Sequence, residues 1–226
     1  MSATLDYARL VDRATQPYRA AGRFAYRFAR GKLSGDPVFR HLLENALIPV
    51  GARVLDLGCG QGLLAALLAT ARAPRVLDYR GIELMPRDVE RARMALGAHC
   101  GVELGDVRDA ALGTADVAVI LDVLHYLPRA DQDGLLARVR ASLAPAGVLL
   151  LRVGDASAGL PFQVTLAVDR AVTLARGHGL ARFHCRSVAQ WGACLEALGF
   201  TVSAAPMSRG TPFANVLLVA RLADRA

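Results

Sequence analysis

The sequence predicts an α/β fold built around a parallel sheet, and three observations lead to that prediction. Between residues 50 and 153, short apolar runs typical of strands alternate with segments of helical period. Some of the runs, such as residues 117–121, are apolar throughout, which is typical of strands covered by helices on both faces. The first run, residues 54–57, leads into glycines at alternate positions and then directly into a helical segment at Leu63. Right-handed crossovers would place the carboxyl ends of parallel strands at one edge, where such sheets bind ligands.

The residues before the first strand are helical in pattern. Leu10 and Val11 mark one apolar face, and a second segment carries three aromatic residues, Phe24, Tyr26 and Phe28, which we interpret as packing. The stretch 31–37 breaks the pattern, and a further helix is expected over residues 37–47 because Asp-Pro is a good helix start.

The alternating part follows in order. Strands are expected at residues 54–57, 79–83, 102–104, 117–121 and 148–153, the last of them after a turn at 145–147. The helices expected between them cover residues 63–71, 86–96 and 131–143.

The last third departs from this alternation. Residues 160–175 have the pattern of a helix, and residues 177–179 are a glycine-flanked break. Ser187 is an expected N-cap for a helix over 188–198, with Gly199 after its end. Two strands, 201–205 and 215–221, then flank a turn. Without a repeat or linker, we expect one domain over 1–226, divided into a helical cap (1–48), a ligand-binding half (50–153) and a substrate-side insertion with a C-terminal hairpin (154–226).

Composition narrows the classes of function. The 226 residues are 54% hydrophobic, enough for one sizeable core, and no apolar run reaches the length of roughly 18 residues that spans a bilayer. With no signal-peptide pattern at the N-terminus, a cytoplasmic protein is expected. The net charge of +7 comes from arginines spread along the chain, which indicates a solvated basic face rather than a nucleic-acid site. The four cysteines form no C-x-x-C pair, so we expect reduced thiols and no metal site.

The glycine turn carries the clearest chemistry. Glycines allow positive φ and let a ligand approach the backbone, while the following helix N-terminus favours a carboxylate or another anion. Asp56, at the end of the first strand, can take a cation or a hydroxyl. The turn reads LDLGCGQG, and it resembles motif I of the class I S-adenosylmethionine-dependent methyltransferases. The resemblance covers roughly residues 50–222. It implies a Rossmann-like three-layer sandwich, with a seven-stranded, mostly parallel sheet whose last strand is antiparallel and an N-terminal helical cap. It also implies S-adenosyl-L-methionine as cofactor and S-adenosyl-L-homocysteine as product.

The same resemblance assigns roles to residues at the strand ends. Gly58, Gly60 and Gly62 would pack against the methionine part of the cofactor, with Asp56 supporting the turn. Glu83, in GIEL, would accept the ribose hydroxyl protons. The predicted cofactor-binding residues are Asp56, Gly58, Cys59, Gly60, Gln61, Gly62, Glu83, Leu84 at the adenine, Asp106 and Val107 in GDV at the adenine amino group, Leu121 and Asp122 at the cofactor's amino group, and Lys32.

The segment LDVLHYL after the fourth strand resembles one that is frequent in small-molecule methyltransferases. Its His125 is the candidate general base, although in relatives a histidine here is often structural, capping the following helix, and we favour that interpretation. Tyr18, His178 and His184 are further possible bases, each better explained by packing or exposure. Methyl transfer needs little more than two reactants held within reach, so the absence of a catalytic set does not exclude an enzyme.

The acceptor is narrowed by what the sequence lacks. It has no N-P-P-Y tetrad, only one lysine for a Lys-Asp-Lys-Glu set, and no metal cluster of the catechol type, which leaves O- or C-methylation of a small aromatic or acyl molecule. The segment RFAYRFARGKLSGDPVF is similar to small methyltransferases of bacterial aryl-polyene pigment clusters. A carrier-bound acceptor would suit the basic group of Arg23, Arg27, Arg30 and Lys32, because carrier proteins are acidic. The oligomeric state stays open.

Three alternatives accompany this hypothesis. An NAD-dependent oxidoreductase is disfavoured by the G-x-G-x-G spacing. A non-catalytic protein that binds S-adenosylmethionine is disfavoured only by the intact cofactor motifs. An RNA methyltransferase is suggested by the charge alone.

Overall fold

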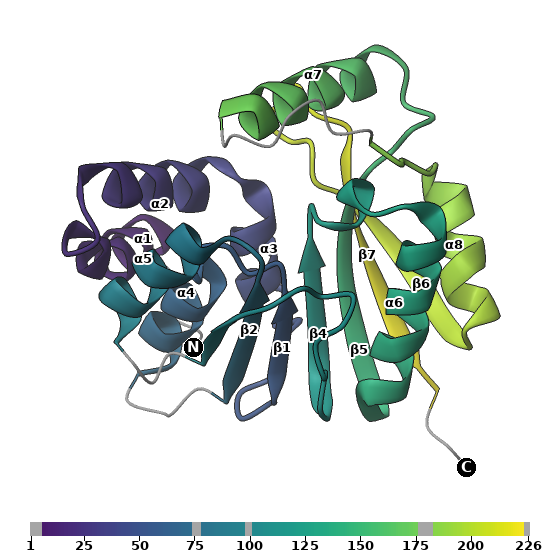
Figure 1. The fold of residues 1–226 in the computed structure, drawn as a ribbon, viewed down its shortest axis with the longest axis horizontal. Coiled ribbons are helices and arrows are strands. Elements are labelled where there is room, and N and C mark those ends of the chain that lie inside the picture. Colours follow the sequence, from purple (N-terminus) through teal and green to yellow (C-terminus); the bar gives the residue numbers. More distant parts are fainter. Residues whose placement is uncertain (1–5, 74–77, 98–100, 176–182, 224–226) are drawn as a thin grey trace. The chain divides into compact units, whose positions relative to one another are not determined.

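The computed structural model describes residues 6–73, 78–97, 101–175 and 183–223. The chain divides into two compact units, residues 1–111 and residues 112–226 (Figure 1). Both units contain helices and strands, and most of the buried residues of the strands are apolar.

The first unit holds the N-terminal helices and three strands. Its elements are α1 (Tyr7–Thr15), η1 (Gln16–Arg19), α2 (Arg23–Gly35), α3 (Pro37–Glu44), β1 (Val54–Leu57), α4 (Leu63–Arg72), β2 (Tyr79–Glu83), α5 (Pro86–Leu96) and β3 (Val102–Leu104). The three strands are parallel and lie in the order β3-β2-β1. All four residues of β1 are buried, as expected for a strand covered on both faces.

The helix α2 differs from the expected pattern in two respects. It continues through Gly31 to Gly35, so the predicted break at residue 31 is wrong. Glycine costs about 1 kcal/mol against alanine in a helix, and the burial of Ala25, Ala29 and Leu33 on one face of α2 outweighs that cost. Phe24 is not packed in the core as we interpreted it: its side chain is 64% exposed and stacks on Phe28 with ring centroids 6.1 Å apart.

The second unit holds four strands. Its elements are β4 (Ala115–Leu121), η2 (Leu124–Tyr126), α6 (Arg129–Ser142), β5 (Leu143–Gly154), α7 (Leu160–Ala175), α8 (Val188–Ala197), β6 (Phe200–Pro206) and β7 (Asn215–Leu222). β4 and β5 are parallel, whereas β7 is antiparallel both to β5 and to β6 and lies between them. The seven described strands, mostly parallel with an antiparallel last strand, confirm the predicted fold class.

The turn predicted at residues 145–147 lies inside β5. Pairing of β5 with β4 shifts register there, because Ala115 faces Leu143 but Val117 faces Val148. Ala146 has a φ of 58°, and a side chain at Gly147 would bring its Cβ within 2.7 Å of a backbone oxygen. The local turn chemistry is therefore present, but it forms a bulge within a continuous strand.

The C-terminal elements agree with the prediction. Ser187 caps α8 in a capping box with Gln190, and Gly199 follows the helix with a φ of 84°. The predicted break at 177–179 lies outside the described residues. Among the described helices, none has both the length and the apolar character needed to cross a bilayer.

Candidate functional site

The glycine turn joins β1 to α4 and has an open side. Gly60 has a φ of 56°, which disfavours any side chain, and a Cβ added there would meet no atom within 4 Å. Gly62 has a φ of 71°, which favours glycine, and a Cβ there would also lie 2.9 Å from the end of the Leu96 side chain on α5. Gly58, with a φ of 75°, completes the turn.

The N-terminus of α4 offers backbone N–H groups. Gly62 is its N-cap, no side chain caps the helix, and no acidic residue lies in its first turn. The first turn of a helix leaves N–H donors that a carboxylate or another anion can accept from, and the helix dipole favours that charge.

Glu83 closes this turn from the neighbouring strand. It ends β2, is 8% exposed, and accepts a hydrogen bond at Oε2 from the Gly60 N–H at 2.8 Å. Its Oε1 accepts from the Met85 N–H, also at 2.8 Å. Two backbone donors therefore fix the carboxylate, and each oxygen keeps a further lone pair for a ligand hydroxyl. Leu84 beside it is 55% exposed.

Asp56 lies in β1, just before the glycine turn, and its partner is Tyr79, which the sequence did not indicate. Its buried carboxylate accepts a hydrogen bond at Oδ2 from the Tyr79 hydroxyl at 2.6 Å. Burial, opposed by that bond, raises the pKa of Asp56 to about 7. Cys59 fills the space beside Gly81, where an added Cβ would lie 2.6 Å from its sulfur, and burial raises the pKa of its thiol.

Gln61, within the glycine turn, forms hydrogen bonds through both its backbone and its side chain. The Tyr18 hydroxyl, fully buried, donates to the Gln61 carbonyl oxygen at 2.7 Å. The Gln61 side chain donates from Nε2 to Asp88 Oδ1 at 3.0 Å, and Arg91 donates to the same oxygen. Tyr18 therefore has a structural role at this turn, although its position 43 residues earlier gave no sequence signal.

Asp106 and Val107 follow β3 in the same unit. Val107 is buried, and Asp106 accepts from the Arg108 backbone N–H at 2.9 Å and from its guanidinium. The bonds from the Arg108 guanidinium hold the pKa of Asp106 below its ordinary value. Lys32, on α2, pairs with Asp36 at 2.7 Å.

In the second unit, Leu121 ends β4 and Asp122 follows it. Asp122 has a φ of 59°, and its carboxylate forms a two-point ion pair with Arg152, with Nε 2.8 Å from Oδ1. Arg152 lies in the apolar strand β5 and is only 1% exposed. Arg152 was not among the predicted site residues, although an arginine inside the apolar run LLLRVG was a signal that could have identified it.

His125 lies in η2 and packs against two aromatic rings, which also contact each other. Its ring centroid is 4.1 Å from that of Tyr126 and 5.4 Å from that of Phe183. Burial lowers the pKa of His125 to about 4. The predicted capping role is wrong, because α6 has Pro128 at its N-cap and no side-chain cap bond.

Hydrogen bonds from His184 and Gln132 to backbone oxygens fix the loop that contains His125. The His125 carbonyl oxygen accepts from the His184 N–H at 2.9 Å. Gln132 donates from Nε2 to the carbonyl oxygens of Leu124 and His184 at 2.8 and 2.7 Å. His178 lies outside the described residues. In the part of the chain that the structure describes, no three residues of the types His, Cys, Asp and Glu gather as a metal site.

The chain is similar to known methyltransferases in sequence. A family model described as a methyltransferase domain matches residues 27–205. The carboxy-S-adenosyl-L-methionine synthase of Chromohalobacter salexigens is 36% identical over 115 residues, which cover 49% of this chain and 43% of that protein. The ubiquinone biosynthesis O-methyltransferase of Xanthomonas axonopodis pv. citri is 31% identical over 147 residues, covering 62% of this chain and 58% of that protein. The chain thus spans about half the length of these curated relatives.

Solved structures agree at the level of the fold. Magnesium protoporphyrin IX methyltransferase (ChlM) from Synechocystis, with bound SAH, has a TM-score of 0.61 at 19% identity, with 96% of each chain covered. The mitomycin 7-O-methyltransferase MmcR has a TM-score of 0.61 at 24% identity, with 96% of this chain and 68% of that chain covered. At these identities the likeness shows the fold alone.

Proposed function

The chain belongs to the class I S-adenosylmethionine-dependent methyltransferases, and on that premise we propose that it transfers a methyl group to the oxygen or carbon of a small aromatic or acyl acceptor. The relative named as a carboxy-S-adenosyl-L-methionine synthase matches 49% of this chain, so it supports the class of cofactor rather than the reaction. The observation that carries the proposal is the Glu83 carboxylate bonded to the Gly60 N–H beside an open glycine turn.

The residues of the first unit fit S-adenosylmethionine. The uncapped N–H groups of α4 suit the carboxylate of its methionine tail, and the open side of Gly60 leaves room for that tail. Glu83, fixed by two amides, would accept from the ribose hydroxyls, and exposed Leu84 would contact the adenine. We keep Asp106 and Val107 as contacts of the adenine amino group, because that group is neutral and needs only a hydrogen-bond acceptor, which the Asp106 carboxylate still offers beside its ion pair with Arg108.

Lys32 and Asp122 are held in ion pairs, which reduces the charge that each has for the cofactor. We keep Lys32, Leu121 and Asp122 as proposed cofactor contacts and expect a smaller contribution from the two ion-paired side chains.

The cofactor supplies an electrophilic methyl group on a sulfonium. The chain's own contribution is to bind, orient and exclude water, since holding two reactants in line can provide most of the acceleration. His125, with a pKa of about 4, is neutral at physiological pH and is a weak base. We therefore propose that His125 positions its loop rather than removing a proton from the acceptor.

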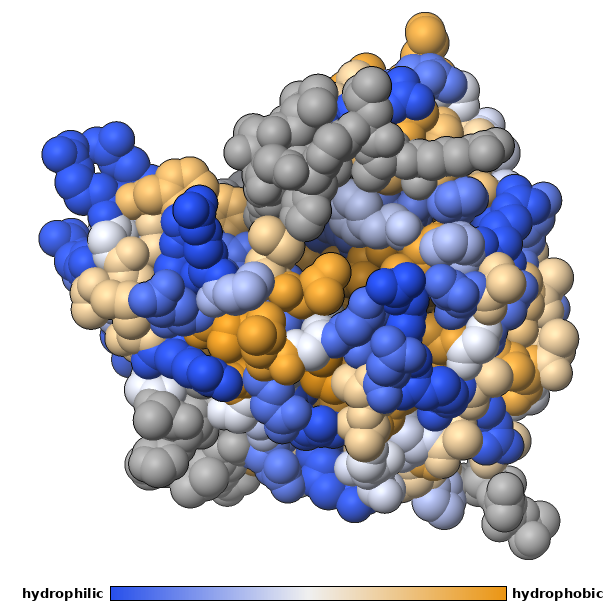
Figure 2. All heavy atoms as spheres, viewed as in Figure 1, coloured by the Kyte–Doolittle hydropathy of each residue, from blue (hydrophilic) through white to orange (hydrophobic). Residues whose placement is uncertain are grey.

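A carrier-bound acceptor is supported by the surface of α2. Hydrophilic side chains project beside more hydrophobic ones over α1 and α2 (Figure 2). Arg30 pairs with Asp12, whereas Arg23 and Arg27 are exposed and form no ion pair with any described residue. These two cations flank the exposed Phe24 and suit an acidic carrier protein.

Calorimetric titration with S-adenosyl-L-homocysteine and with NAD tests the proposal. We expect saturable binding of the first and none of the second. Saturable binding of NAD without binding of S-adenosyl-L-homocysteine would instead support a dinucleotide-dependent oxidoreductase. RNA methylation loses its basis if the chain has no salt-dependent affinity for RNA.

A matched pair of charge reversals tests the carrier surface. Arg23→Glu with Arg27→Glu should lower kcat/KM for a carrier-bound acceptor and leave the free acceptor unaffected. Arg221→Glu, an exposed cation at the C-terminal end of β7, is the control. Equal effects of the two on the carrier-bound acceptor would reject α2 as the docking surface.

A further inference from the structure

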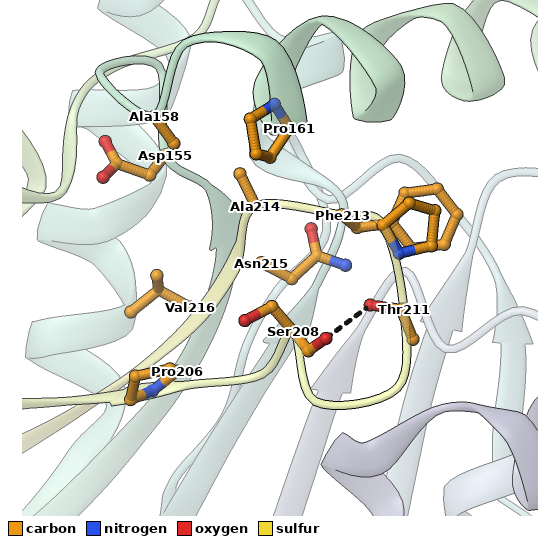
Figure 3. Close-up of a pocket in the computed structure, with 11 residues that line it drawn as sticks. Asp155, Ala158, Pro161, Pro206, Ser208, Thr211, Phe213, Ala214, Asn215 and Val216 are labelled. Atoms are coloured by element: carbon orange, nitrogen blue, oxygen red, sulfur yellow. Dashed lines mark hydrogen bonds between the residues drawn. The ribbon is translucent and has the colours of Figure 1, made fainter.

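A cavity of about 400 Å³ lies wholly within the second unit, where β5 ends and β7 begins (Figure 3). Gly154 at the end of β5 pairs with Asn215, and Arg152 two residues earlier pairs with Leu121 of β4. The cavity therefore lies at the same edge of this four-stranded sheet as Asp122. Its volume is in the range of small-molecule sites, about 300–1,000 Å³.

The lining is mostly apolar and rigid. Prolines and one aromatic ring form much of the wall, and the polar groups are few: Ser208, Thr211 and Asn215. Figure 3 shows Asp155 and Pro161 on one side of the cavity and the loop of Ser208 and Thr211 on the other. A lining with three prolines and a phenylalanine suits an apolar ring, which loses little conformational freedom on binding.

Among the described residues that line the cavity, Asp155 is the only charged one. Its Oδ1 accepts from the Ser157 N–H at 3.0 Å, from the Ser157 hydroxyl at 2.7 Å and from the Val188 N–H at 3.1 Å. Burial opposes ionisation, but these bonds outweigh it and hold the pKa of Asp155 below its ordinary value. The carboxylate is thus negatively charged and fixed, and no bond from the described residues reaches its Oδ2.

We propose that this cavity binds the methyl acceptor and that Asp155 selects neutral or cationic aromatic acceptors against anionic ones. An anionic group in the cavity would face a fixed carboxylate without a cation in the lining to compensate. A hydroxyl or amine on the ring could instead donate to Oδ2. The proposal rests on the proposed function only in calling the ligand a methyl acceptor.

Three probes that share one ring and differ in charge test the selection: benzylamine, benzyl alcohol and benzoate. Ligand-detected NMR titrations of the full chain at pH 7 should give benzoate an affinity at least about tenfold below that of benzylamine, with benzyl alcohol between them. Asp155→Asn keeps the Oδ1 that accepts three bonds and removes the charge, so the ratio should fall to about threefold or less. Glu196→Gln removes an exposed acid on α8 and should preserve the ratio.

The site itself is tested with Ala158→Phe, which fills the cavity and should abolish binding of all three probes. Should that variant not fold, amide shifts of Thr211 and Asn215 in the wild-type chain take its place, and probes that leave both unmoved overturn the site. Benzoate binding as tightly as benzylamine, or an unchanged ratio in Asp155→Asn, overturns the selection. Titration of the same samples with S-adenosyl-L-homocysteine separates the two proposals, because its failure rejects the methyltransferase function and leaves the cavity result standing.

Discussion

Glu83 in the first unit and Asp122 in the second are both acids at the carboxyl end of a parallel strand, yet their partners differ. Two backbone amides bond to Glu83, whereas the buried guanidinium of Arg152 pairs with Asp122. Amides orient a carboxylate and leave its full charge for a ligand. An arginine neutralises the charge and gives the carboxylate a structural role instead. Acids at similar places in a strand are therefore distinguished by their partners, and the following changes test that distinction.

The largest effect is expected for Asp122→Ala. It leaves the guanidinium of Arg152, 1% exposed, without its carboxylate, and breaking a buried pair costs about 3–5 kcal/mol in free energy of unfolding. Denaturant unfolding measures this cost. Arg152→Met should cost less, since the Asp122 side chain is 32% exposed and can be hydrated. Equal stability of the two single variants would contradict the claim that Arg152 is the more deeply buried charge of the pair and the more costly one to leave without its carboxylate.

The second effect concerns Asp56 and pH. Its pKa is raised from 3.8 to about 7 in the folded chain, so between these values the unfolded chain ionises first and stability falls as pH rises. Since one pKa unit corresponds to about 1.4 kcal/mol, the decline should be a few kcal/mol and should level off above pH 7. In Asp56→Asn the part of the decline between pH 4 and pH 7 that is due to Asp56 should vanish. Identical pH profiles of the two proteins would contradict the buried, protonated acid.

The third effect is on ligand affinity. Glu83→Ala should weaken binding of S-adenosyl-L-homocysteine by about 1–3 kcal/mol, the scale of hydrogen bonds to a charged group. Glu103→Ala is the matched control, because Glu103 is an exposed acid of β3 that pairs with Arg80. Unchanged calorimetric affinity in a folded Glu83→Ala protein would reject the assignment of Glu83.

A smaller effect is expected for Tyr18→Phe. Removing the hydroxyl leaves the Gln61 carbonyl oxygen without its donor and should destabilise the glycine turn by about 1 kcal/mol. We expect weaker cofactor affinity with little change in kcat. Tyr26→Phe is the control, because Tyr26 lies on the next helix, α2, and is partly exposed. A loss confined to kcat would show that Tyr18 acts in catalysis rather than at the turn.

The smallest effect is expected for His125→Ala. Because the imidazole is already neutral above pH 5, the variant should keep measurable activity and the wild-type pH profile over pH 6–8. Steady-state rates across that range measure this. Complete inactivation of a folded variant would assign His125 a catalytic role.

The fold was predictable where the order and spacing of apolar residues determine the local structure. The strand Ala115–Leu121 contains the predicted run 117–121 and the helix Pro86–Leu96 has the predicted bounds, because a continuous apolar run and an initial proline act locally. The continuation of α2 through Gly31 was not predictable, since burial of Ala29 and Leu33 against other elements outweighs a local preference.

The candidate site was predictable only in part, for a related reason. Glycines and strand-end acids have sequence signatures, because their roles depend on backbone geometry. Their partners have none: Tyr18, Tyr79 and Arg152 reach Gln61, Asp56 and Asp122 from other elements. Hydrogen-bond partners between distant segments depend on tertiary structure, which no local pattern records.

A crystal structure of the chain with S-adenosyl-L-homocysteine tests the central claim most directly. We expect the ribose hydroxyls to donate to the Glu83 carboxylate and the amino-acid tail to lie against Gly58, Gly60 and the N-terminus of α4. A ligand bound elsewhere, or side chains filling that space, would contradict the role assigned to the glycine turn and Glu83.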